Sequence, residues 1–345
     1  SYTKGNDNAK EESGMKHTLR LSLTLIAVLF LLSWGFASVQ RSGDGVLSHP
    51  GGESDTSPVQ EAAVPDATRT LRVLHGGSIE EMPMDQYLLG VLRAEMPASF
   101  ELEALKAQAV AARTYTLHKM ARGTIARHPD ADACDDITCC KAYRTAEDAA
   151  ADWGARALYY EEKLKRAVAE TDGEVIVYNG EPVLAVFFSS AAGHTQGAGE
   201  VWQSDLPYLQ SVKSPEDETL VPNYYSIVTF TAAEFRERFC AAYPTARLDG
   251  GAESFITDIV RNDAGFVATL CVGGVTLTGN DLRMVLGLRS PSFTVSVEDD
   301  TLTFHVTGYG HGVGMSQYGA NAMAKEGYTC EEILEHYFTG AQVVR

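Results

Sequence analysis

The chain has 345 residues, of which 45% are hydrophobic and 31 are glycine, and its formal net charge is −18. This length allows one large domain or two ordinary ones with appendages, and the composition is typical of a globular protein rather than a disordered one. The negative charge argues against nucleic acid or anionic lipid as the main partner, although a local basic site is compatible with it.

Segment 15–39 opens with basic residues, Lys16 and Arg20 among them, and continues as a long apolar run. The run is long enough to span a bilayer, and the cations before it favour an N-terminus in the cytoplasm. A cleavable signal peptide is the alternative, because "FASV" offers a small-residue cleavage site, but the run is long for a signal core. We therefore expect an upstream extension at 1–14, a single-pass transmembrane anchor at 15–39, and a body outside the cytoplasm.

Segment 40–67 is rich in Gly, Ser, Pro and acidic residues, which predicts a flexible stalk. The remaining sequence shows no internal repeat and no second low-complexity linker. We therefore expect one domain at 68–345.

The stretch "VLRAEMPASFELEALKAQAVAARTY" places a glutamate, Glu95, directly before Met96-Pro97. Because proline disfavours helical geometry in the residue before it, a helix carrying residues 85–94 should end close to Glu95. The next helix should begin near Ser99, which can cap it, and run past Ala112. A carboxylate at such a break is exposed and positioned by two rigid elements, although an ordinary solvated acid is the plainer interpretation.

The second of these helices carries Ala104, Ala107 and Ala111 on one stripe, which should pack in the core. Lys106 and Arg113, seven residues apart, share a different face. That face is either solvated or lines a cleft beside Glu95.

Strand signals follow after residue 170, beginning with an Asn179-Gly180 turn between two β-rich runs, which is typical of a hairpin. Further strands are expected within 254–262, 266–279 and 292–308, and helices within 231–243, 279–288 and 316–327. Helices packed on mixed, mostly antiparallel sheets make an α+β domain.

The stretch "HPDADACDDITCC" brings His128, Cys134, Cys139 and Cys140 close together in sequence. One histidine and three cysteines match the ligands that tetrahedral Zn²⁺ prefers, and four protein ligands would make such a zinc structural. A disulfide of Cys134 and free thiols are the alternatives.

Two short stretches, the serine-containing "FFSSAAGHT" and the glycine-rich "GYGHGVGMSQYGANAMAKEG", lack the patterns of a phosphate loop, a zinc peptidase or a nucleophilic serine. The first offers Ser189 and Ser190, whose hydroxyls can hydrogen-bond sugars. The second places His311 among alternating glycines, which allow close backbone approach to a ligand or simply a tight turn.

These two stretches and the one around Glu95, in this order and spacing, resemble the stage II sporulation protein D family from about Thr68 to Val343. The resemblance implies a lytic transglycosylase that cuts peptide-free peptidoglycan strands during engulfment in sporulation. It also implies a membrane-held protein that acts between the mother-cell and forespore membranes, with stage II sporulation proteins P and M as partners. Amidase enhancers share the domain, so a non-catalytic glycan-binding enhancer is the alternative.

The resemblance also implies roles for individual residues. Glu95 matches the catalytic acid of the family, and the cysteine loop resembles the metal-binding loop of some members. The residues that would bind the glycan by this match are Lys106, Gln108, Arg113, Ser189, Ser190, Tyr208, His311 and Gln317. The two cations could bind the lactyl carboxylate of muramic acid. Since cations lower a carboxyl pKa whereas a general acid needs it raised, burial of Glu95 would have to dominate.

Overall fold

The computed structural model describes residues 64–123, 127–202 and 204–345. The expected extension at 1–14, the anchor at 15–39 and most of the stalk at 40–67 lie outside these residues. Within the described ranges, no helix has both the length and the apolar composition that a membrane crossing requires. The last residues of the expected stalk are already folded, since the 3-10 turn η1 (Asp66–Thr68) buries Asp66.

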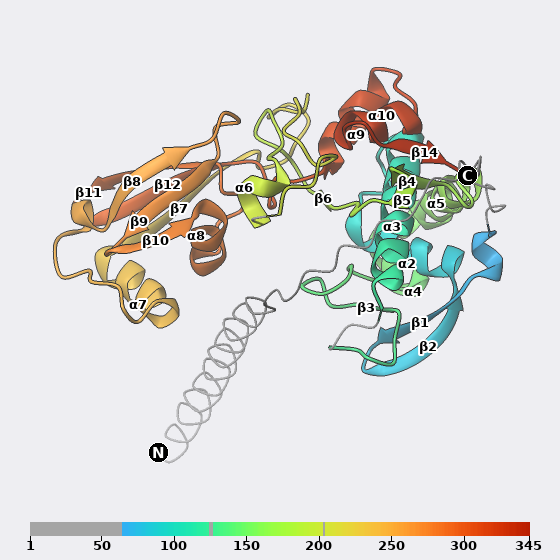
Figure 1. Cartoon of the computed structure of the whole chain (residues 1–345), viewed down its shortest axis with the longest axis horizontal. Coiled ribbons are helices and arrows are strands. Elements are labelled where there is room, and N and C mark those ends of the chain that lie inside the picture. The colour runs from blue at the N-terminus through green and yellow to red at the C-terminus, as the bar shows by residue number, and fades with distance from the viewer. Residues whose placement is uncertain (1–63, 124–126, 203) are drawn as a thin grey trace, which may run out of the picture.

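Buried apolar side chains form two separate clusters, which divide the described chain into two lobes (Figure 1). We call the lobe that contains Glu95 the Glu95 lobe, and the lobe formed by residues 225–307 the insert lobe. The insert lobe is continuous in sequence, whereas the Glu95 lobe is built from the chain before and after it. The expected range 68–345 therefore contains two hydrophobic cores.

The Glu95 lobe is mainly helical. Its helices are α2 (Met84–Glu95), α3 (Leu102–Ala121), α4 (Ala146–Trp153), α5 (Ala157–Glu170), α9 (Gln317–Lys325) and α10 (Cys330–Tyr337), with the 3-10 turn η2 (Gly154–Arg156). Its strands are β1 (Thr70–His75), β2 (Ser78–Pro83), β3 (Ala133–Cys134), β4 (Val175–Tyr178), β5 (Glu181–Pro182) and β14 (Gln342–Val344). They form two small sheets, β2-β1-β3 and β14-β4-β5.

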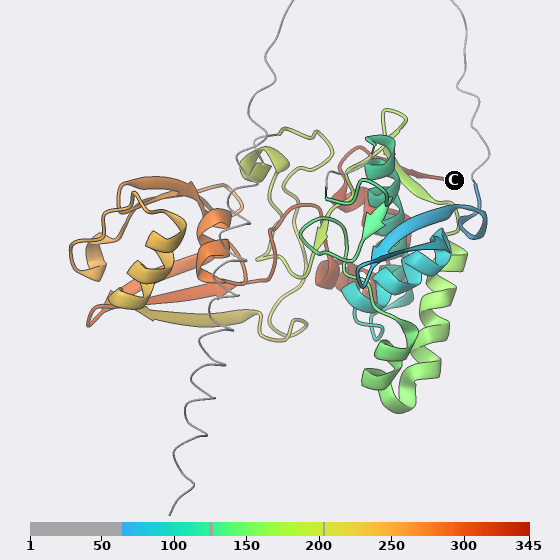
Figure 2. The same cartoon turned by 90° about the horizontal axis from the view of Figure 1, so that it is seen from below.

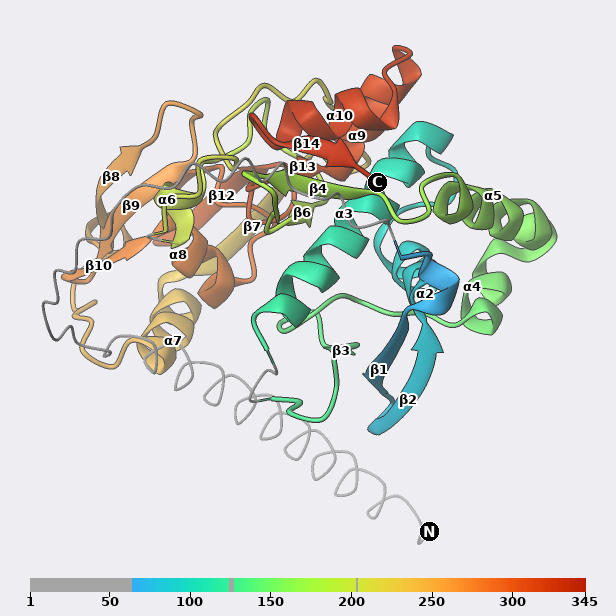
Figure 3. The ribbon, with the colours of Figure 1, turned by 45° about the vertical axis from the view of Figure 1, so that its right-hand side comes forward.

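Helix α3 is the centre of this lobe and packs against α2, α5, α9 and α10 (Figure 3). The predicted stripe of Ala104, Ala107 and Ala111 is confirmed, because all three are fully buried. The predicted cap at Ser99 is wrong. The helix begins at Leu102, and the backbone N–H of Glu101 donates instead to Asn321 Oδ1 of α9 at 2.8 Å.

The insert lobe contains two three-stranded antiparallel sheets, β11-β12-β7 and β10-β9-β8, with α7 and α8 (Figures 1 and 2). Its elements are β7 (Tyr225–Thr231), α7 (Ala232–Ala242), η3 (Ala252–Ser254), β8 (Ile256–Arg261), β9 (Val267–Val272), β10 (Val275–Thr278), α8 (Gly279–Leu286), β11 (Phe293–Glu298) and β12 (Thr301–Thr307). Capping boxes at Thr231 and Thr278 begin the two helices.

Most strand pairs in the described residues are antiparallel, so the predicted α+β class with mainly antiparallel sheets is confirmed. The predicted hairpin is present between β4 and β5, where Asn179 and Gly180 have φ of 52° and 82°. Positive φ at both positions suits a type I′ turn, which explains why this dipeptide is so strong a signal.

Between the lobes lie segment 187–202 and the first part of the glycine-rich stretch, 308–316 (Figure 1). They contribute β6 (Phe187–Phe188), α6 (Ala198–Trp202) and β13 (Met315–Ser316), with β6 and β13 paired in parallel. The buried carboxylate of Glu216 accepts hydrogen bonds from the Ala191 N–H at 2.7 Å and from the Ser214 hydroxyl at 2.6 Å, and also from the Ser316 hydroxyl. One carboxylate thus holds three segments of the chain together.

Candidate functional site

Glu95 is the last residue of α2, as the sequence predicts, and the chain leaves the helix at Met96 in extended geometry. Its side chain is half-buried rather than solvated. Its Oε1 accepts a hydrogen bond from the backbone N–H of Ala142 at 2.9 Å. The carboxyl group is therefore fixed by a segment that follows the cysteine loop, 47 residues further along the chain.

Burial raises the pKa of Glu95 above its usual value, while the Lys141 ammonium and the Ala142 hydrogen bond lower it. Burial is the largest of the three effects, so the carboxyl group holds its proton to higher pH than an exposed glutamate does. A raised pKa, which a general acid needs, is therefore compatible here with a neighbouring cation, which lowers the pKa. A nearby carboxylate is not among the causes of this shift for the residues that the structure describes.

Lys141 supplies the cation at this site, and sequence reasoning missed it. Its Nζ lies 3.9 Å from the ring centroid of Tyr115 on α3 and 3.7 Å from that of Phe187 on β6. Burial lowers the pKa of Lys141 to about 8, although Glu95 opposes this shift. The only sequence signal was a lysine directly after the cysteine pair.

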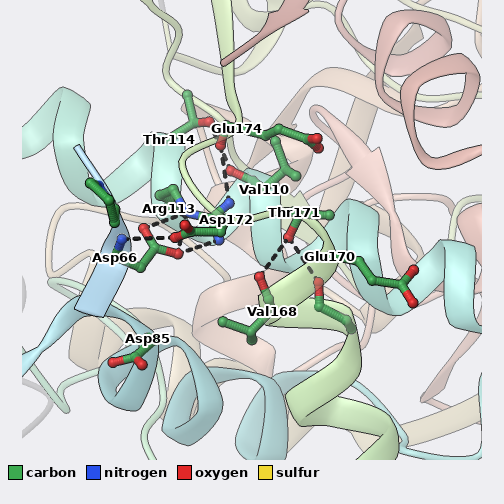
Figure 4. Close-up of polar contacts among 12 residues, drawn as sticks. Asp66, Asp85, Val110, Arg113, Thr114, Val168, Glu170, Thr171, Asp172 and Glu174 are labelled. Atoms are coloured by element: carbon green, nitrogen blue, oxygen red, sulfur yellow. Dashed lines mark hydrogen bonds and ion pairs between the residues drawn. The ribbon is translucent and has the colours of Figure 1, made fainter. Parts of the chain in front are cut away.

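Arg113 is buried and pairs with Asp66, so it fits neither the solvated face nor the cleft beside Glu95 that the sequence left open. Its guanidinium is buried and donates to both carboxylate oxygens of Asp66, with Nη2 2.6 Å from Oδ2, and to the carbonyl of Glu174 at 3.0 Å (Figure 4). The backbone N–H of Asp66 donates in turn to Asp172. Arg113 thus ties the N-terminal turn of the lobe to the end of α5.

Lys106 is also engaged elsewhere, in ion pairs with Glu103 at 2.8 Å and Glu170 at 2.5 Å. It borders a cavity of about 340 Å³ whose lining includes four glutamates: Glu103, Glu170, Glu174 and Glu331. Lys106 and Arg345 line the same cavity and pair with three of these glutamates, so Lys106 offers no unpaired cation there. Lys106 and Arg113 share a face of α3, but Tyr115, half a turn away, is the residue that faces Lys141.

Several of the expected glycan-binding residues lie close together, around β6 and β13. Gln317 donates to the side chain of Gln108 at 3.2 Å, and both are buried. Ser189 accepts hydrogen bonds from the Tyr318 N–H and the Ser316 hydroxyl through its carbonyl, while the buried Ser190 pairs with Tyr309 through both backbone groups. Tyr208 is also buried, and its hydroxyl accepts from the Leu184 N–H at 3.1 Å, so its contact with glycan stays a prediction.

His311 lies half-buried, with its ring centroid 5.6 Å from those of Phe188 and Trp202. Burial lowers its pKa to about 3, and the cations of Lys141 and Arg283 contribute. The imidazole is therefore neutral at physiological pH. The glycine at position 310 next to it has φ of 122°, and a Cβ there would lie 2.6 Å from that of Phe188, so the close approach requires glycine.

The cysteine loop forms a compact cluster that could hold a metal ion. The ligand atoms of His128, Cys134, Cys139 and Cys140 all lie within 4.8 Å of one another, and the cysteines form no disulfide. His128 Nε2 is 3.4 Å from each of the two adjacent sulfurs, which are 3.9 Å apart. Tetrahedral Zn–S bonds of about 2.3 Å imply sulfur separations of roughly 3.8 Å, so the cluster has the right size.

The surroundings of the cluster also suit a metal. His128 Nδ1 lies 2.9 Å from the Ala131 carbonyl, which fixes this nitrogen as the donor and leaves Nε2 as the ligand. Lys119 donates to the Cys140 sulfur at 3.2 Å and so offsets thiolate charge. The three cysteines outside the cluster are free thiols, of which Cys240 and Cys271 are half-buried and Cys330 is buried.

Known proteins similar to this chain come from one family of sporulation proteins and from an amidase enhancer. A family model described as "Stage II sporulation protein" matches residues 75–178, which include Glu95 and the cysteine loop. Stage II sporulation protein D of Bacillus subtilis is 43% identical over 77% of this chain and 76% of its own length. The chain belongs to the stage II sporulation protein D family.

Two further proteins are similar to this chain. The stage II sporulation protein D of Bacillus amyloliquefaciens is 37% identical over 77% of this chain and 75% of its own length. The amidase enhancer of Bacillus subtilis is 30% identical over 73% of this chain but only 39% of its own length. Together they support a sporulation role at the cell wall.

Proposed function

We propose that this member of the stage II sporulation protein D family is a lytic transglycosylase that cuts the MurNAc-GlcNAc bonds of peptide-free peptidoglycan strands. The observation that carries the proposal is Glu95, a half-buried carboxyl group with a raised pKa at a helix break. A raised pKa increases the fraction of the carboxyl group that carries the proton a glycosidic oxygen needs.

In the proposed reaction Glu95 first protonates the glycosidic oxygen, so the bond to C1 of the muramic residue breaks. The same carboxylate then takes a proton from the C6 hydroxyl, whose oxygen bonds to C1 and closes the 1,6-anhydro ring. Lys141 stabilises the carboxylate between these steps, and the Ala142 N–H keeps it oriented. The proton returns to Glu95, and no water is consumed.

A retaining hydrolase would need a second carboxylate roughly 5 Å from the first, and that charge would raise the pKa of the acid. For the described residues, the electrostatic effects on Glu95 come from Lys141 and the Ala142 amide. This environment favours the lytic route, in which one carboxyl group does both proton transfers.

The test is to incubate the purified protein with peptide-free glycan strands and to analyse the products by mass spectrometry. Products with 1,6-anhydro-muramic ends support the lytic reaction. Reducing muramic ends would show hydrolysis instead, and intact strands would refute the proposed activity.

The amidase-enhancer relative favours a second candidate, a non-catalytic protein that binds glycan and stimulates a partner amidase. Under this alternative the protein leaves strands intact but raises the rate at which an added peptidoglycan amidase releases peptides. The two assays together separate the candidates.

We also propose the cellular setting that the sequence suggests. Segment 15–39 would anchor the protein in a membrane, with its lobes between the mother-cell and forespore membranes, where stage II sporulation proteins P and M would be its partners. Family membership is the support for this setting.

The cysteine loop is proposed to hold one structural Zn²⁺, with all four coordination positions filled by protein ligands. We expect metal analysis of the purified protein to find about one equivalent of zinc, and Cys134→Ser to lose most of it and lower the melting temperature. Cys240→Ser, which removes a cysteine outside the cluster, is the matched control and should keep the zinc. Metal-free protein with an oxidised Cys134 would contradict this assignment.

The raised pKa of Glu95 determines how the rate of the proposed glycan cleavage depends on pH. Because the protonated form is the acid, kcat/KM should fall as pH rises through this pKa. Lys141→Met removes the cation that lowers it, so the alkaline limb should move to higher pH. Lys165→Met, at an exposed lysine of α5 paired with Glu162, should leave the limb in place. A limb unmoved or moved to lower pH in Lys141→Met would count against Glu95 as the titrating acid.

A further inference from the structure

Two arginines of the insert lobe lie against the glycine-rich stretch that carries His311. Arg289 follows α8, and its carbonyl accepts hydrogen bonds from the Gly310 N–H at 2.8 Å and from Arg283 Nε at 3.0 Å. Its guanidinium carbon is 4.1 Å from the ring centroid of Tyr309. The backbone of Arg289 therefore joins the insert lobe to the glycine-rich stretch and holds both side chains there.

The charges of these arginines are uncompensated within the described residues. Arg283 and Arg289 make no ion pair with a carboxylate there, in contrast with Lys106 and Arg113. The Nε of Arg289 is buried and has no hydrogen-bond partner in the same residues. An unpaired buried donor costs free energy, and a hydrogen-bond acceptor from a ligand would remove that cost.

Electrostatic and ring contacts connect the arginines to the environment of Glu95. Burial lowers the pKa of His311, and the cations of Lys141 and Arg283 add to that shift. Burial raises the pKa of Tyr318, and Arg289 opposes this shift. The Tyr318 ring packs edge-on against Phe100, 4.9 Å between centroids, in the connection that follows Glu95. Packing contacts lead from the arginines toward the acid as well: Gly310, which is hydrogen-bonded to Arg289, packs against Phe188. The neighbouring Phe187 contacts Lys141, the cation that acts on Glu95.

Exposed aromatic rings lie among these groups. The side chains of Trp202 and Tyr309 are 38% and 43% exposed, and Trp202 contacts His311. Such rings offer apolar faces on which a pyranose ring can stack, while Arg283 and Arg289 present planar forks that match a carboxylate.

We propose that Arg283 and Arg289 bind the free lactyl carboxylate of muramic acid and so select peptide-free strands, an assignment that rests on the proposed glycan-cleaving function. When a stem peptide is attached, the lactyl carboxyl group is a neutral amide and offers no charge to a guanidinium. The arginines therefore discriminate by the charge of the substrate, the role that the sequence had suggested for Lys106 and Arg113.

The test measures binding in a Glu95→Gln background, so that strands are not consumed. Calorimetry compares peptide-free strands with the same strands whose lactyl carboxylates have been coupled to methylamine. We expect the background protein to bind the carboxylate form at least tenfold more tightly, the usual value of a hydrogen bond to a charged group. Arg283→Gln and Arg289→Gln should each remove most of this preference while still binding the amidated strands.

Arg238→Gln is the matched control, since Arg238 is an exposed arginine on α7 of the same lobe. It should keep the full preference, and circular dichroism should show that every variant is folded. Unchanged preference in both arginine variants, or equal loss in Arg238→Gln, would overturn the inference and leave the glycan-cleaving function standing. Failure of the background protein to bind either strand, together with intact strands after incubation with wild type, would refute the proposed function itself.

Discussion

Glu95→Gln should lower the rate of glycan cleavage by about 10²–10⁴-fold, the usual contribution of general acid–base catalysis. The amide keeps the shape of the side chain and can still accept the hydrogen bond from the Ala142 N–H. It cannot donate a proton to the glycosidic oxygen or take one from the C6 hydroxyl. Binding of peptide-free strands should therefore survive while turnover is lost.

The measurement is single-turnover release of anhydro-muramic ends. Glu81→Gln, at an exposed glutamate of β2, is the matched control and should cleave like the unchanged protein. Turnover by Glu95→Gln within a few-fold of that control would remove Glu95 from the mechanism. A parallel loss of thermal stability would instead assign Glu95 a structural role.

Arg113→Met should destabilise the protein by about 3–5 kcal/mol, because it leaves the carboxylate of Asp66 buried without its cation. Replacing both partners, as in Asp66→Leu with Arg113→Met, should recover much of that loss, since a buried ion pair contributes little net stability over an apolar pair. Urea denaturation measures both effects.

The same variants decide between two roles for Arg113. If it only holds the fold, Arg113→Met at low temperature should cleave at a rate proportional to its folded fraction. A folded variant with an unchanged denaturation midpoint but no glycan binding would show that Arg113 contacts substrate after all.

Local sequence features were predictable, because short-range physics decides them. The proline after Met96 ended α2 at Glu95, and the Asn179-Gly180 pair made the hairpin. The His and Cys residues of one loop met because few residues separate them. Each of these depends on neighbours within about a dozen positions.

Long-range partners were not predictable in the same way. Arg113 meets Asp66 across 47 residues, and nothing in the spacing of α3 says that its cationic face turns toward η1 and α5 rather than toward Glu95. Lys141 was missed because its place between Tyr115 and Phe187 depends on strand β6, which lies much further along the chain. Arg283 stood in a stretch that the sequence described only as a helix, and Arg289 directly after it.

The Glu95 lobe is built from segments before and after the insert lobe, and this affects the order in which the chain folds during synthesis. The insert lobe, contiguous over 225–307, can fold as soon as it has left the ribosome. Helix α3, in contrast, is fully packed only after α9 and α10 have been made, and contacts between such distant segments form slowly. Strands β6 and β13 must also meet before Lys141 has its aromatic neighbours. The proposed catalytic centre is therefore complete only after residues 315–337 have been made, so chains that stop before them should lack the proposed cleaving activity.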